Sequence, residues 1–523
     1  MKNIRFPVFI ITVLLLASCS EQDKRPNIIF IMADDHTQEA ISAYGSYRNT
    51  TPNIDRIAES GMLFENAYVS NSICAPSRAV ILTGKHSHIN GKIDNSGHPF
   101  DSTQITFPKL MQEAGYETAM IGKWHLRSQP TGFDYWRVLP GQGFYYNPVF
   151  ISPEGRENIE GYTTDIITDL ALEWLSGRKS DRPFMLMYQH KAPHREWEPP
   201  YRYYKDFISK EFKEPATLFD DYEGRGTAAK EAEMSVLRHM NMAGDIKIHP
   251  DVLTDLGIEA MSNWDFRALT GKLARYNDEQ LTQWKEVYGR MNEEFREAYP
   301  GMDSTDLMRF KYQRYMQDYM ACIAALDENV GRILDYVEDN GLEENTLIVY
   351  TSDQGFYLGE HGWFDKRFMY EESMSTPLII SWPGQVKAGS RSDKLVQNID
   401  YAETFLDAAG LDVPDEMQGE SMLPLLMGKD VEWRDALYYH YYEYPAVHMV
   451  KRHYGIKTDR YKLIHFYNDI DEWELYDLKN DPMEMKNVYG NTDYADIKAE
   501  LKERLKGLRK YYKDTTGLKV TLH

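Results

Sequence analysis

The fold is decided by one short stretch, Asn27-Ile28-Ile29-Phe30-Ile31-Met32, in which every residue after the first is apolar. A continuous apolar run of this length predicts a strand that is buried on both faces, as the strands of parallel sheets are. The run stops at Asp34-Asp35. Ligands of open α/β sheets bind at the carboxyl ends of the strands, so these two carboxylates are candidate site residues.

Three further apolar runs have the same form and also lead to polar residues. They are residues 118–121, followed by Lys123 and His125; residues 184–188, followed by His190 and His194; and residues 346–350, followed by Asp353-Gln354. Helical patterns lie between the strands, for example over residues 164–175 and 314–340. This alternation predicts a parallel α/β sheet, with the polar residues converging at one of its edges.

Two other parts of the chain do not follow this alternation of buried strands and helices. Residues from about 205 to 306 are charged and helix-prone, which predicts a helical insertion beside the sheet that shapes the entrance to a site. After about Trp433 the chain has aromatic, β-prone runs at residues 437–444, 461–467 and 473–478, followed by a helical pattern at 494–512. We expect a main domain over residues 19–432 and a C-terminal subdomain over residues 433–523, built as a small antiparallel sheet with one helix.

The N-terminus has the form of a signal peptide. Lys2 and Arg5 precede an apolar run over residues 6–17 that is too short to span a bilayer. The run ends in Leu16-Ala17-Ser18-Cys19, which resembles the lipobox of bacterial lipoproteins. The resemblance implies removal of residues 1–18, acylation of the Cys19 thiol, and a periplasmic or cell-surface lipoprotein of a Gram-negative bacterium, held to the membrane by its lipid anchor. The alternative is an ordinary signal peptide with a chance cysteine.

The charge of the chain limits its partners. Lys2 and Arg5 are the only charged residues of the leader, so its removal takes the net charge from −22 to −24. A protein of this charge does not bind polyanions through its overall field, and nucleic acid is not expected as a partner. An anionic substrate must therefore be met by a local positive pocket.

Cysteine usage singles out Cys74. Of the 3 cysteines, Cys19 belongs to the lipobox, and Cys322 lies in a helical run where we expect a buried, inert thiol. The remaining one opens the stretch Cys74-Ala75-Pro76-Ser77-Arg78, which continues to Thr83-Gly84. The proline suits the first turn of a helix and the glycine its end, so Cys74 is predicted at a helix N-terminus, where backbone N–H groups favour an anion. By itself the stretch is also consistent with a cysteine at an ordinary helix cap.

With these residues the sequence resembles the formylglycine-dependent (type I) sulfatases, whose maturation motif reads Cys-x-Pro-Ser-Arg and continues into Thr-Gly. Six further landmarks agree in order and spacing over nearly the whole mature chain. They are Pro26-Asn27-Ile28 leading to Asp34-Asp35, Thr51-Pro52-Asn53-Ile54-Asp55, Gly122-Lys123-Trp124-His125, Thr351-Ser352-Asp353-Gln354-Gly355, Glu474-Leu475-Tyr476-Asp477-Leu478 and Asp481-Pro482. The resemblance implies an alkaline-phosphatase-like sandwich, with a large mostly parallel sheet between helices and a smaller C-terminal antiparallel sheet with a helix.

The resemblance also implies a mechanism. A formylglycine-generating maturation enzyme oxidises Cys74 to an aldehyde, which is hydrated to a gem-diol. One hydroxyl attacks sulfur, and the second then expels sulfate and restores the aldehyde, which is covalent catalysis with a self-regenerating nucleophile. One Ca²⁺ is implied at Asp34, Asp35, Asp353 and Gln354, and such hard oxygen ligands suit this ion. The family commonly has Asn where this chain has Gln354.

The remaining polar positions of the family match Arg78, Lys123, His125, His194 and Lys366. By resemblance, the cations stabilise charge on the sulfate oxygens, and His125 accepts the proton of the second hydroxyl during sulfate release. His194 and Lys366 protonate or stabilise the leaving alcohol. His190 is interpreted as structural, because His194, which follows Pro193, fits the pattern better.

For the substrate, the chain is most similar to bacterial N-acetylglucosamine-6-O-sulfatases that act on glycosaminoglycan fragments of heparin or heparan type. Candidate sugar contacts are His98 and the pair Asp365 and Arg367, which flank Lys366. For that pair the alternative is an exposed ion pair. Three other functions stay open: a sulfatase for another sulfated glycan, a phosphonate or phosphate ester hydrolase of the same superfamily, and a sulfated-glycan binder without turnover. Only one set of candidate metal ligands is visible in the sequence, which favours a sulfate ester over a phosphate or phosphonate ester. The predicted catalytic residues are all present, which argues against binding without turnover.

Overall fold

The structure is a computed structural model that describes residues 25–258 and 263–517. The predicted signal peptide and the predicted lipidation of Cys19 lie outside the described residues. Among the helices of the described ranges, none combines the length and the apolar character that crossing a membrane requires.

The four predicted buried strands lie side by side in one ten-stranded sheet. They are β9 (Thr346–Ser352), β1 (Asn27–Ala33), β8 (Phe184–Gln189) and β4 (Glu117–Lys123), in that spatial order. Each pairs in parallel with its neighbour. Their carboxyl ends therefore meet at one edge of the sheet, which brings Asp34, Lys123, His190 and Asp353 to the same side of the molecule.

Shorter strands extend this sheet at both sides. Beyond β4 lie β5 (Tyr135–Leu139), β6 (Val149–Ser152) and β7 (Gly155–Asn158); beyond β9 lie β10 (Leu378–Ser381), β2 (Met62–Phe64) and β11 (Ser390–Ser392). The pairs that involve β6 or β10 are antiparallel. The sheet is thus mixed but mostly parallel where it carries the polar strand ends.

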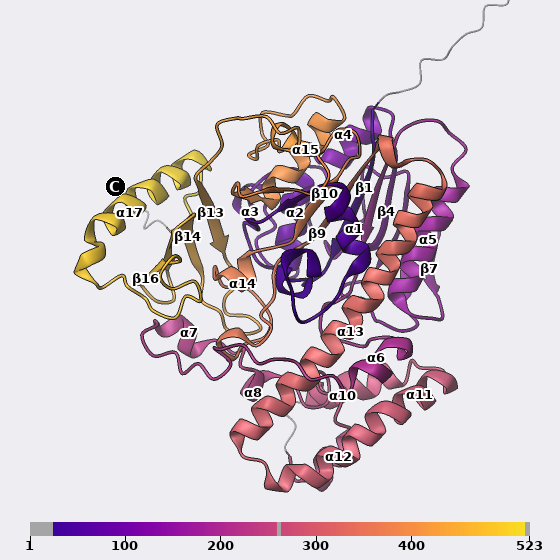
Figure 1. Cartoon of the computed structure of the whole chain (residues 1–523), viewed down its shortest axis with the longest axis vertical. Helices are drawn as coiled ribbons and strands as arrows, with labels where there is room; N and C mark the ends of the chain where they lie inside the picture. Colours follow the sequence, from indigo (N-terminus) through magenta and orange to yellow (C-terminus); the bar gives the residue numbers. More distant parts are fainter. Residues whose placement is uncertain (1–24, 259–262, 518–523) are drawn as a thin grey trace, which may run out of the picture.

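Helices cover both faces of the sheet (Figure 1). One face packs against α1 (Pro52–Ser60), α5 (Thr163–Gly177) and α13 (Ser304–Asp339), and the other against α2 (Cys74–Thr83), α4 (Phe107–Glu113) and α15 (Tyr401–Ala408). Successive residues of a strand point to opposite faces, so Ile29 and Ile31 belong to the first core and Ile28 and Phe30 to the second. This explains why β1 is apolar throughout.

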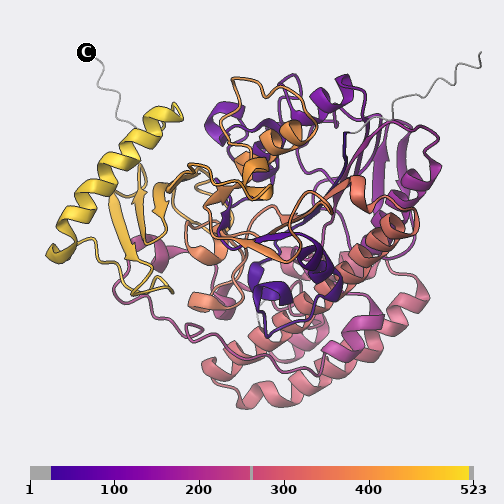
Figure 2. The same cartoon turned by 45° about the horizontal axis from the view of Figure 1, so that its top comes forward.

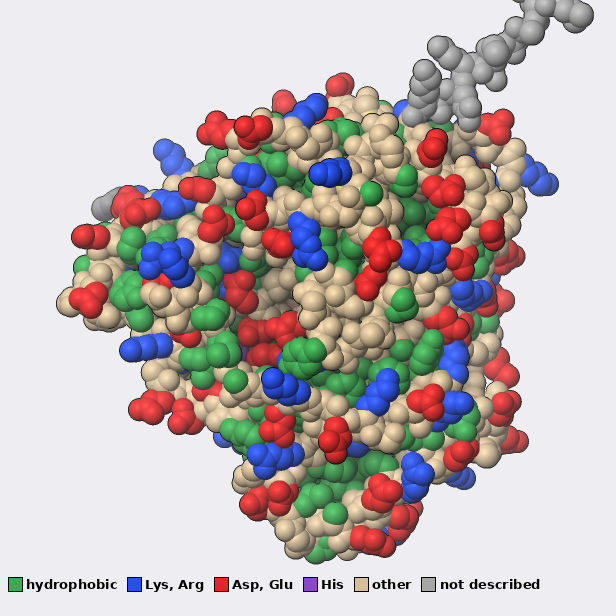
Figure 3. All heavy atoms as spheres, in the orientation of Figure 1, with side chains coloured by type: hydrophobic (Ala, Val, Ile, Leu, Met, Phe, Trp, Pro, Cys, Tyr) green, Lys and Arg blue, Asp and Glu red, His purple; other side chains and the backbone are tan. Residues whose placement is uncertain are grey.

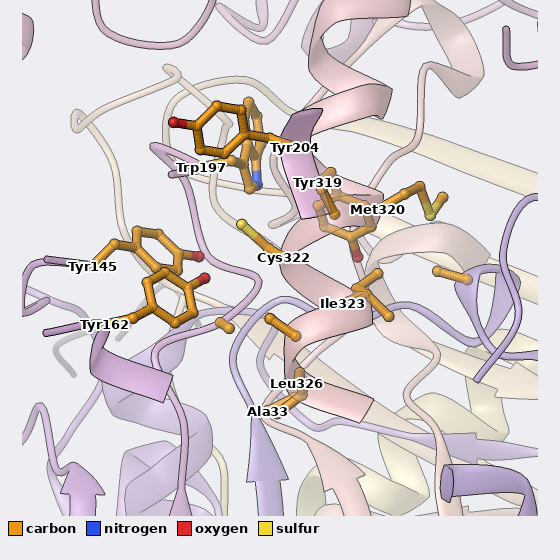
Figure 4. Packing of buried hydrophobic residues seen from close by; sticks show 14 of the residues in the cluster. Ala33, Tyr145, Tyr162, Trp197, Tyr204, Tyr319, Met320, Cys322, Ile323 and Leu326 are labelled. Carbon is orange, nitrogen blue, oxygen red and sulfur yellow. The ribbon is translucent and has the colours of Figure 1, made fainter. Parts of the chain in front are cut away.

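Cys322 lies in the first core, on α13. Figure 4 shows its side chain pointing toward Tyr145 and Tyr162, with Trp197 nearby. The residue is fully buried, and this burial raises the pKa of its thiol to about 12. A protonated, inaccessible thiol is a poor nucleophile, as expected from the sequence.

Most of the segment from 205 to 306 forms a helical lobe at the lower end of the view in Figure 1, and Figure 2 shows it from another side. The stretch around Thr227 instead lies against the C-terminal sheet, where Thr227 donates hydrogen bonds to Glu472. The described residues of the segment contain helices and connections but no strand. The helices are α7 (Thr227–Glu231), α8 (Val236–His239), α9 (Pro250–Asp255), α10 (Asn263–Leu273), α11 (Asp278–Trp284) and α12 (Arg290–Ala298). Preceding them, α6 (Tyr201–Phe207) packs against α13.

The C-terminal part forms a separate four-stranded antiparallel sheet covered by one helix. The strands are β13 (Ala436–Tyr441), β14 (His453–Thr458), β15 (Tyr461–Phe466) and β16 (Glu472–Asp477), and the helix is α17 (Ala495–Tyr511). Sequence reasoning missed β14, whose Gly455 and Lys457 weaken the strand pattern. Lys457 is nevertheless buried and pairs with Glu371 at 3.2 Å. The predicted fold class, a large mostly parallel sheet between helices plus a small antiparallel sheet, is confirmed.

Candidate active site

Cys74 is the first residue of α2, as predicted, and is fully buried at the edge where the parallel strands end. The backbone N–H of Ala75 donates to Asn95 Oδ1 at 3.0 Å, and Ser77 Oγ donates to the carbonyl oxygen of Asp353. These bonds fix the helix start against the strand ends. Burial raises the pKa of the Cys74 thiol to about 12, so an unmodified Cys74 is not a thiolate near neutral pH.

Three carboxylates meet beside Cys74. Oxygens of Asp34, Asp35 and Asp353 lie within 4.8 Å of one another, and all three residues are fully buried. Burial raises the pKa of Asp35 to about 6, with Asp353 adding to the rise and Lys366 opposing it. The Gln354 amide nitrogen donates to Asp35 Oδ1 and lies 3.7 Å from Cys74 Sγ.

Three cations balance the three carboxylates. Lys123 contacts Asp34, Lys366 Nζ lies 2.7 Å from Asp35, and Arg78 Nε and Nη2 lie 3.0 and 2.9 Å from Asp353 Oδ2. All of these side chains are buried, and buried charges persist only when they are paired. The cluster is therefore close to neutral overall.

The cluster also has the donor set of a cation site. Two of its buried oxygens, Asp34 Oδ1 and Gln354 Oε1, have no hydrogen-bond partner among the described residues. Unsatisfied buried oxygens are costly, and a hard divalent cation would satisfy both. The residues present thus fit the Ca²⁺ that the resemblance implies.

Two of the three predicted strand-end histidines approach this cluster. His194 Nε2 lies 3.7 Å from Asp35 Oδ2, and a ring nitrogen of His194 lies within 4.8 Å of Cys74 Sγ. His125 follows β4, and its Nδ1 is buried without a hydrogen-bond partner in the part of the chain that the structure describes. Burial, reinforced by Lys123, lowers the pKa of both rings well below the usual value, so both are neutral here and able to accept a proton.

His190 does not join the cluster. It is fully buried beside the Tyr188 ring, and neither of its ring nitrogens has a partner among the described residues. Burial alone lowers the pKa of His190 to about 3. Its interpretation as a structural residue agrees with this position.

Several site residues have an unfavourable backbone conformation. Asp35, His125, Asp365 and Arg367 all have positive φ, at 67°, 58°, 78° and 99°. Such residues cost about 1–3 kcal/mol each and persist where the surrounding structure holds them. Gly122, with φ 107°, precedes Lys123, and a Cβ there would lie 1.8 Å from the carbonyl oxygen of Gln189. Only glycine permits this approach of β4 to β8.

A cavity of about 1160 Å³ lies beside the cluster. Its wall includes His125, His194 and Lys366 from the cluster, and Arg267 and Lys272 from α10 of the helical lobe. Cys74 does not itself line the cavity, but its Sγ lies within 4.8 Å of a ring nitrogen of His194, which does. On the face shown in Figure 3, acidic and basic side chains are mixed.

One side of the cavity carries the predicted sugar contacts Asp365 and Arg367. Both are buried rather than exposed, and Arg367 Nε donates to Asp365 Oδ1 at 3.0 Å. Arg367 also contacts Glu443, and His448 Nε2 lies 3.2 Å from Asp365 Oδ2. Sequence reasoning missed Glu443 and His448, because they follow β13 far along the chain and belong to no recognisable motif.

The structure does not bring His98 to the cavity. Its side chain is exposed and is absent from the cavity wall, while its carbonyl oxygen accepts a hydrogen bond from Lys92 at 2.6 Å. Asn95, three residues earlier, does line the cavity. The assignment of His98 as a sugar contact stays a prediction without support from its position.

Comparison with known proteins agrees with the residues assembled here. The family model described as "Sulfatase" matches residues 26–411, and one described as "N-sulphoglucosamine sulphohydrolase, C-terminal" matches residues 359–511. An N-acetylglucosamine-6-O-sulfatase from Bacteroides thetaiotaomicron is 51% identical over 512 residues, which cover 96% of this chain and 90% of the relative.

Two solved structures share this fold but differ in the compounds that their descriptions name. A protein described in complex with its substrate D-glucosamine-2-N,6-O-disulfate is 50% identical, with a TM-score of 0.89 and coverage of 94% of this chain and 99% of the other. The phosphonate monoester hydrolase of Agrobacterium radiobacter is 22% identical, with a TM-score of 0.66 and coverage of 93% and 96%. The second likeness concerns the fold alone, so the choice of ester depends on the site residues.

Proposed function

We propose that this chain, which belongs to the sulfatase family, hydrolyses the 6-O-sulfate ester of N-acetylglucosamine in glycosaminoglycan fragments of heparin or heparan type. The observation that carries the proposal is the charge-balanced cluster around Cys74, which opens toward a cavity with buried polar residues for a sugar. The 51% identity to an N-acetylglucosamine-6-O-sulfatase supports the choice of sugar and position.

Cys74 is proposed to act as formylglycine, made by a maturation enzyme. The hydrated aldehyde would supply one hydroxyl that attacks sulfur and a second that expels sulfate. The raised pKa of the buried thiol supports this, because an unmodified Cys74 would be a weak nucleophile near neutral pH. The position at the start of α2 directs backbone N–H groups toward the anion.

Asp34, Asp35, Asp353 and Gln354 are proposed to hold one Ca²⁺, which would add positive charge beside the sulfate. Arg78, Lys123 and Lys366 then surround the sulfate oxygens, where they stabilise the charge that builds in the transition state. Each already contacts a carboxylate of the cluster, so its position is fixed before substrate binds.

The proton transfers are assigned to His125, His194 and Lys366. His125 accepts the proton of the second hydroxyl during sulfate release, and its partnerless Nδ1 supports an acceptor role. His194, with Lys366, protonates or stabilises the leaving sugar alcohol, since both line the cavity into which that alcohol departs.

The sugar ring is proposed to contact Asp365 and Arg367. Both are held by neighbours, Asp365 by His448 and Arg367 by Glu443, so they present oriented groups to sugar hydroxyls. The lipid anchor at Cys19 and the periplasmic or cell-surface location rest on the lipobox alone.

The rival functions are less well supported. A phosphonate or phosphate ester hydrolase would share the fold, but the two groups of possible metal ligands near Cys74 in the described residues share Asp34, and the second needs the Cys74 thiol that is proposed to be converted. A binder without turnover would not need a proton acceptor such as the neutral His125 next to the cations of the cluster.

The test is release of inorganic sulfate from defined sugars. We expect the protein, produced with its maturation enzyme, to act on N-acetylglucosamine 6-sulfate and to release roughly a hundredfold less from a uronic acid 2-sulfate, because a substrate whose hydroxyls miss buried polar partners loses transition-state binding. Preferential release from the uronic acid would overturn the substrate, and hydrolysis of phosphonate esters without sulfate release would overturn the reaction.

A further inference from the structure

We propose that Lys191 forms a second anion-binding subsite in the cavity, for an additional acidic group carried by the sulfated sugar. The proposal rests on the proposed function, because it concerns the same cavity and substrate. It adds a contact that discriminates between differently substituted sugars.

Lys191 lies next to the sulfate pocket but takes no part in the cluster. It directly follows His190, and its carbonyl oxygen accepts from the backbone N–H of His194 at 2.9 Å, so one tight turn carries both Lys191 and His194 into the cavity wall. The side chain is 95% buried, since 5% of the residue is exposed.

The ammonium of Lys191 has no anionic partner. It lies 4.7 Å from the centre of the Tyr145 ring, and it forms neither an ion pair nor a side-chain hydrogen bond with any residue in the described ranges. A buried ammonium without a contacting carboxylate is costly, because the more distant Glu196 and Glu198 offset its desolvation only in part. The other cations beside the sulfate, Arg78, Lys123 and Lys366, all have such a partner.

The two carboxylates that act on Lys191 are already engaged by other groups. Glu196 pairs with Lys272 of α10, and Glu198 accepts a hydrogen bond from the Tyr276 hydroxyl at 2.9 Å. Glu198 and Lys272 both line the cavity, as does the exposed Arg267 of α10. Lys191 and Lys272 balance Glu196 and Glu198 in charge, and Lys191 is the member of this set without a contacting partner among the described residues.

The pKa of Lys191 agrees with an ammonium that has no contacting carboxylate among the described residues. Burial lowers it to about 8, and Lys272 contributes to the fall, while Glu196 and Glu198 oppose it without cancelling it. A bound anion would stabilise the charged ammonium and so raise this pKa. The subsite is thus strongest below pH 8, where the ammonium is charged, and weakens as the pH rises through that value.

The chemistry of the partner follows from the charge. A sugar whose 6-sulfate occupies the cluster can carry a second acid in two ways: an N-sulfate on the same ring, or the carboxylate of a neighbouring uronic acid. Both offer oxygens that an ammonium binds as charge-assisted hydrogen bonds. A neutral N-acetyl group on an isolated sugar offers no such charge.

The experiment compares three 6-sulfated substrates in wild type and Lys191→Met: N-acetylglucosamine 6-sulfate, N-sulfoglucosamine 6-sulfate, and an N-acetylated disaccharide with a uronic acid at the reducing side. We expect Lys191→Met to lower kcat/KM about tenfold or more for at least one acidic substrate. The loss for N-acetylglucosamine 6-sulfate should be less than about twofold. The substrate that responds identifies which acid the subsite takes.

Two matched variants guard against a structural effect. Lys387→Met removes a lysine on an exposed connection outside the cavity wall and should leave kcat/KM unchanged for all three substrates. Lys191→Arg keeps the charge and should keep the preference for the acidic substrate above pH 8, where wild type loses it. A lysine with only a packing role would not give this pH difference.

The outcomes separate the two proposals. Equal losses on all three substrates, or none on any, would overturn the subsite while leaving the sulfatase assignment intact. Absence of sulfate release from every substrate by wild-type protein with a converted Cys74 would overturn the proposed function itself.

Discussion

The two ends of the cavity are built differently. At the sulfate end, each carboxylate of the cluster touches a cation, and the groups come from the ends of β1, β4 and β9, the start of α2, and a loop after β9. At the sugar end, Asp365 and Arg367 depend on Glu443 and His448, which follow β13, while Arg267 and Lys272 come from the helical lobe. One end is made by adjacent strands, the other by three distant parts of the chain.

This difference separates reaction from recognition. Groups fixed by neighbouring strands of one sheet hold their mutual geometry whatever substrate arrives, so they suit the step that all sulfate esters share. Groups contributed by the C-terminal part and the lobe are able to vary without disturbing the sheet. Substitutions at the sulfate end should therefore affect every substrate, and those at the sugar end only sugars.

The largest effect is expected for Cys74→Ala. Without the precursor of the nucleophile, turnover of both a small aryl sulfate and N-acetylglucosamine 6-sulfate should fall by about 10⁴-fold or more. Steady-state rates with the two substrates measure this, and circular dichroism checks the fold. Residual activity on one substrate but not the other would contradict this comparison, because the two substrates would then not depend on the same reacting group at the sulfate end.

Asp353→Asn should have the next largest effect. The change removes one charge from a buried cluster, takes away the carboxylate that Arg78 contacts most closely and weakens the proposed Ca²⁺ site. We expect roughly a 10²–10³-fold loss on both substrates, together with loss of tightly bound calcium measured by elemental analysis. Retention of stoichiometric calcium with unchanged turnover would remove Asp353 from the ligand set.

Arg367→Ala should act at the sugar end alone. Turnover of N-acetylglucosamine 6-sulfate should fall roughly tenfold or more, because a buried hydroxyl contact and the pairing of Asp365 are lost. The small aryl sulfate should be hardly affected. Arg391→Ala, which removes an exposed ion pair with Glu65, is the control and should change neither rate. Equal losses on both substrates would place Arg367 in the sulfate pocket or the fold.

His190→Leu should have the smallest effect on turnover, because His190 touches no member of the cluster, and its effect on stability depends on pH. Its pKa is about 3 when folded and about 6.5 when unfolded, so the unfolded chain binds the proton first as the pH falls. Wild type therefore loses up to about 1.4 kcal/mol of stability per pH unit between those values, and full stability is present above pH 6.5.

The variant lacks this contribution. Relative to wild type, its free energy of unfolding in denaturant titrations should rise steadily as the pH is lowered from 7 to 4. If the difference in free energy of unfolding between the two proteins stayed constant over that range, folding would not lower the pKa of His190.

Sequence reasoning reached the sulfate end because its signals are local. Apolar runs followed by Asp34, Lys123 or Asp353 place polar groups at strand ends, and parallel pairing then brings them together without further information. The start of α2 at Cys74 was likewise readable from Pro76 and Gly84.

The residues of the sugar end were harder to predict from the sequence, because their contacts join distant segments of the chain. Glu443 and His448 reach Arg367 and Asp365 across more than seventy residues of chain, as the 76-residue separation of Arg367 from Glu443 shows. No periodicity encodes such a contact. His98 illustrates the reverse case: it was a candidate sugar contact, but its side chain is exposed to solvent and does not line the cavity.

The central claim, that the strand-end cluster acts through a converted Cys74, is tested most directly by one titration. Protein preparations with different degrees of conversion would be assayed for sulfate release from N-acetylglucosamine 6-sulfate, and the aldehyde content at residue 74 would be measured in each by peptide mass spectrometry. We predict that the rate rises in proportion to the aldehyde fraction and extrapolates to zero for the unmodified thiol. Full activity in protein that carries only cysteine at residue 74 would contradict the account.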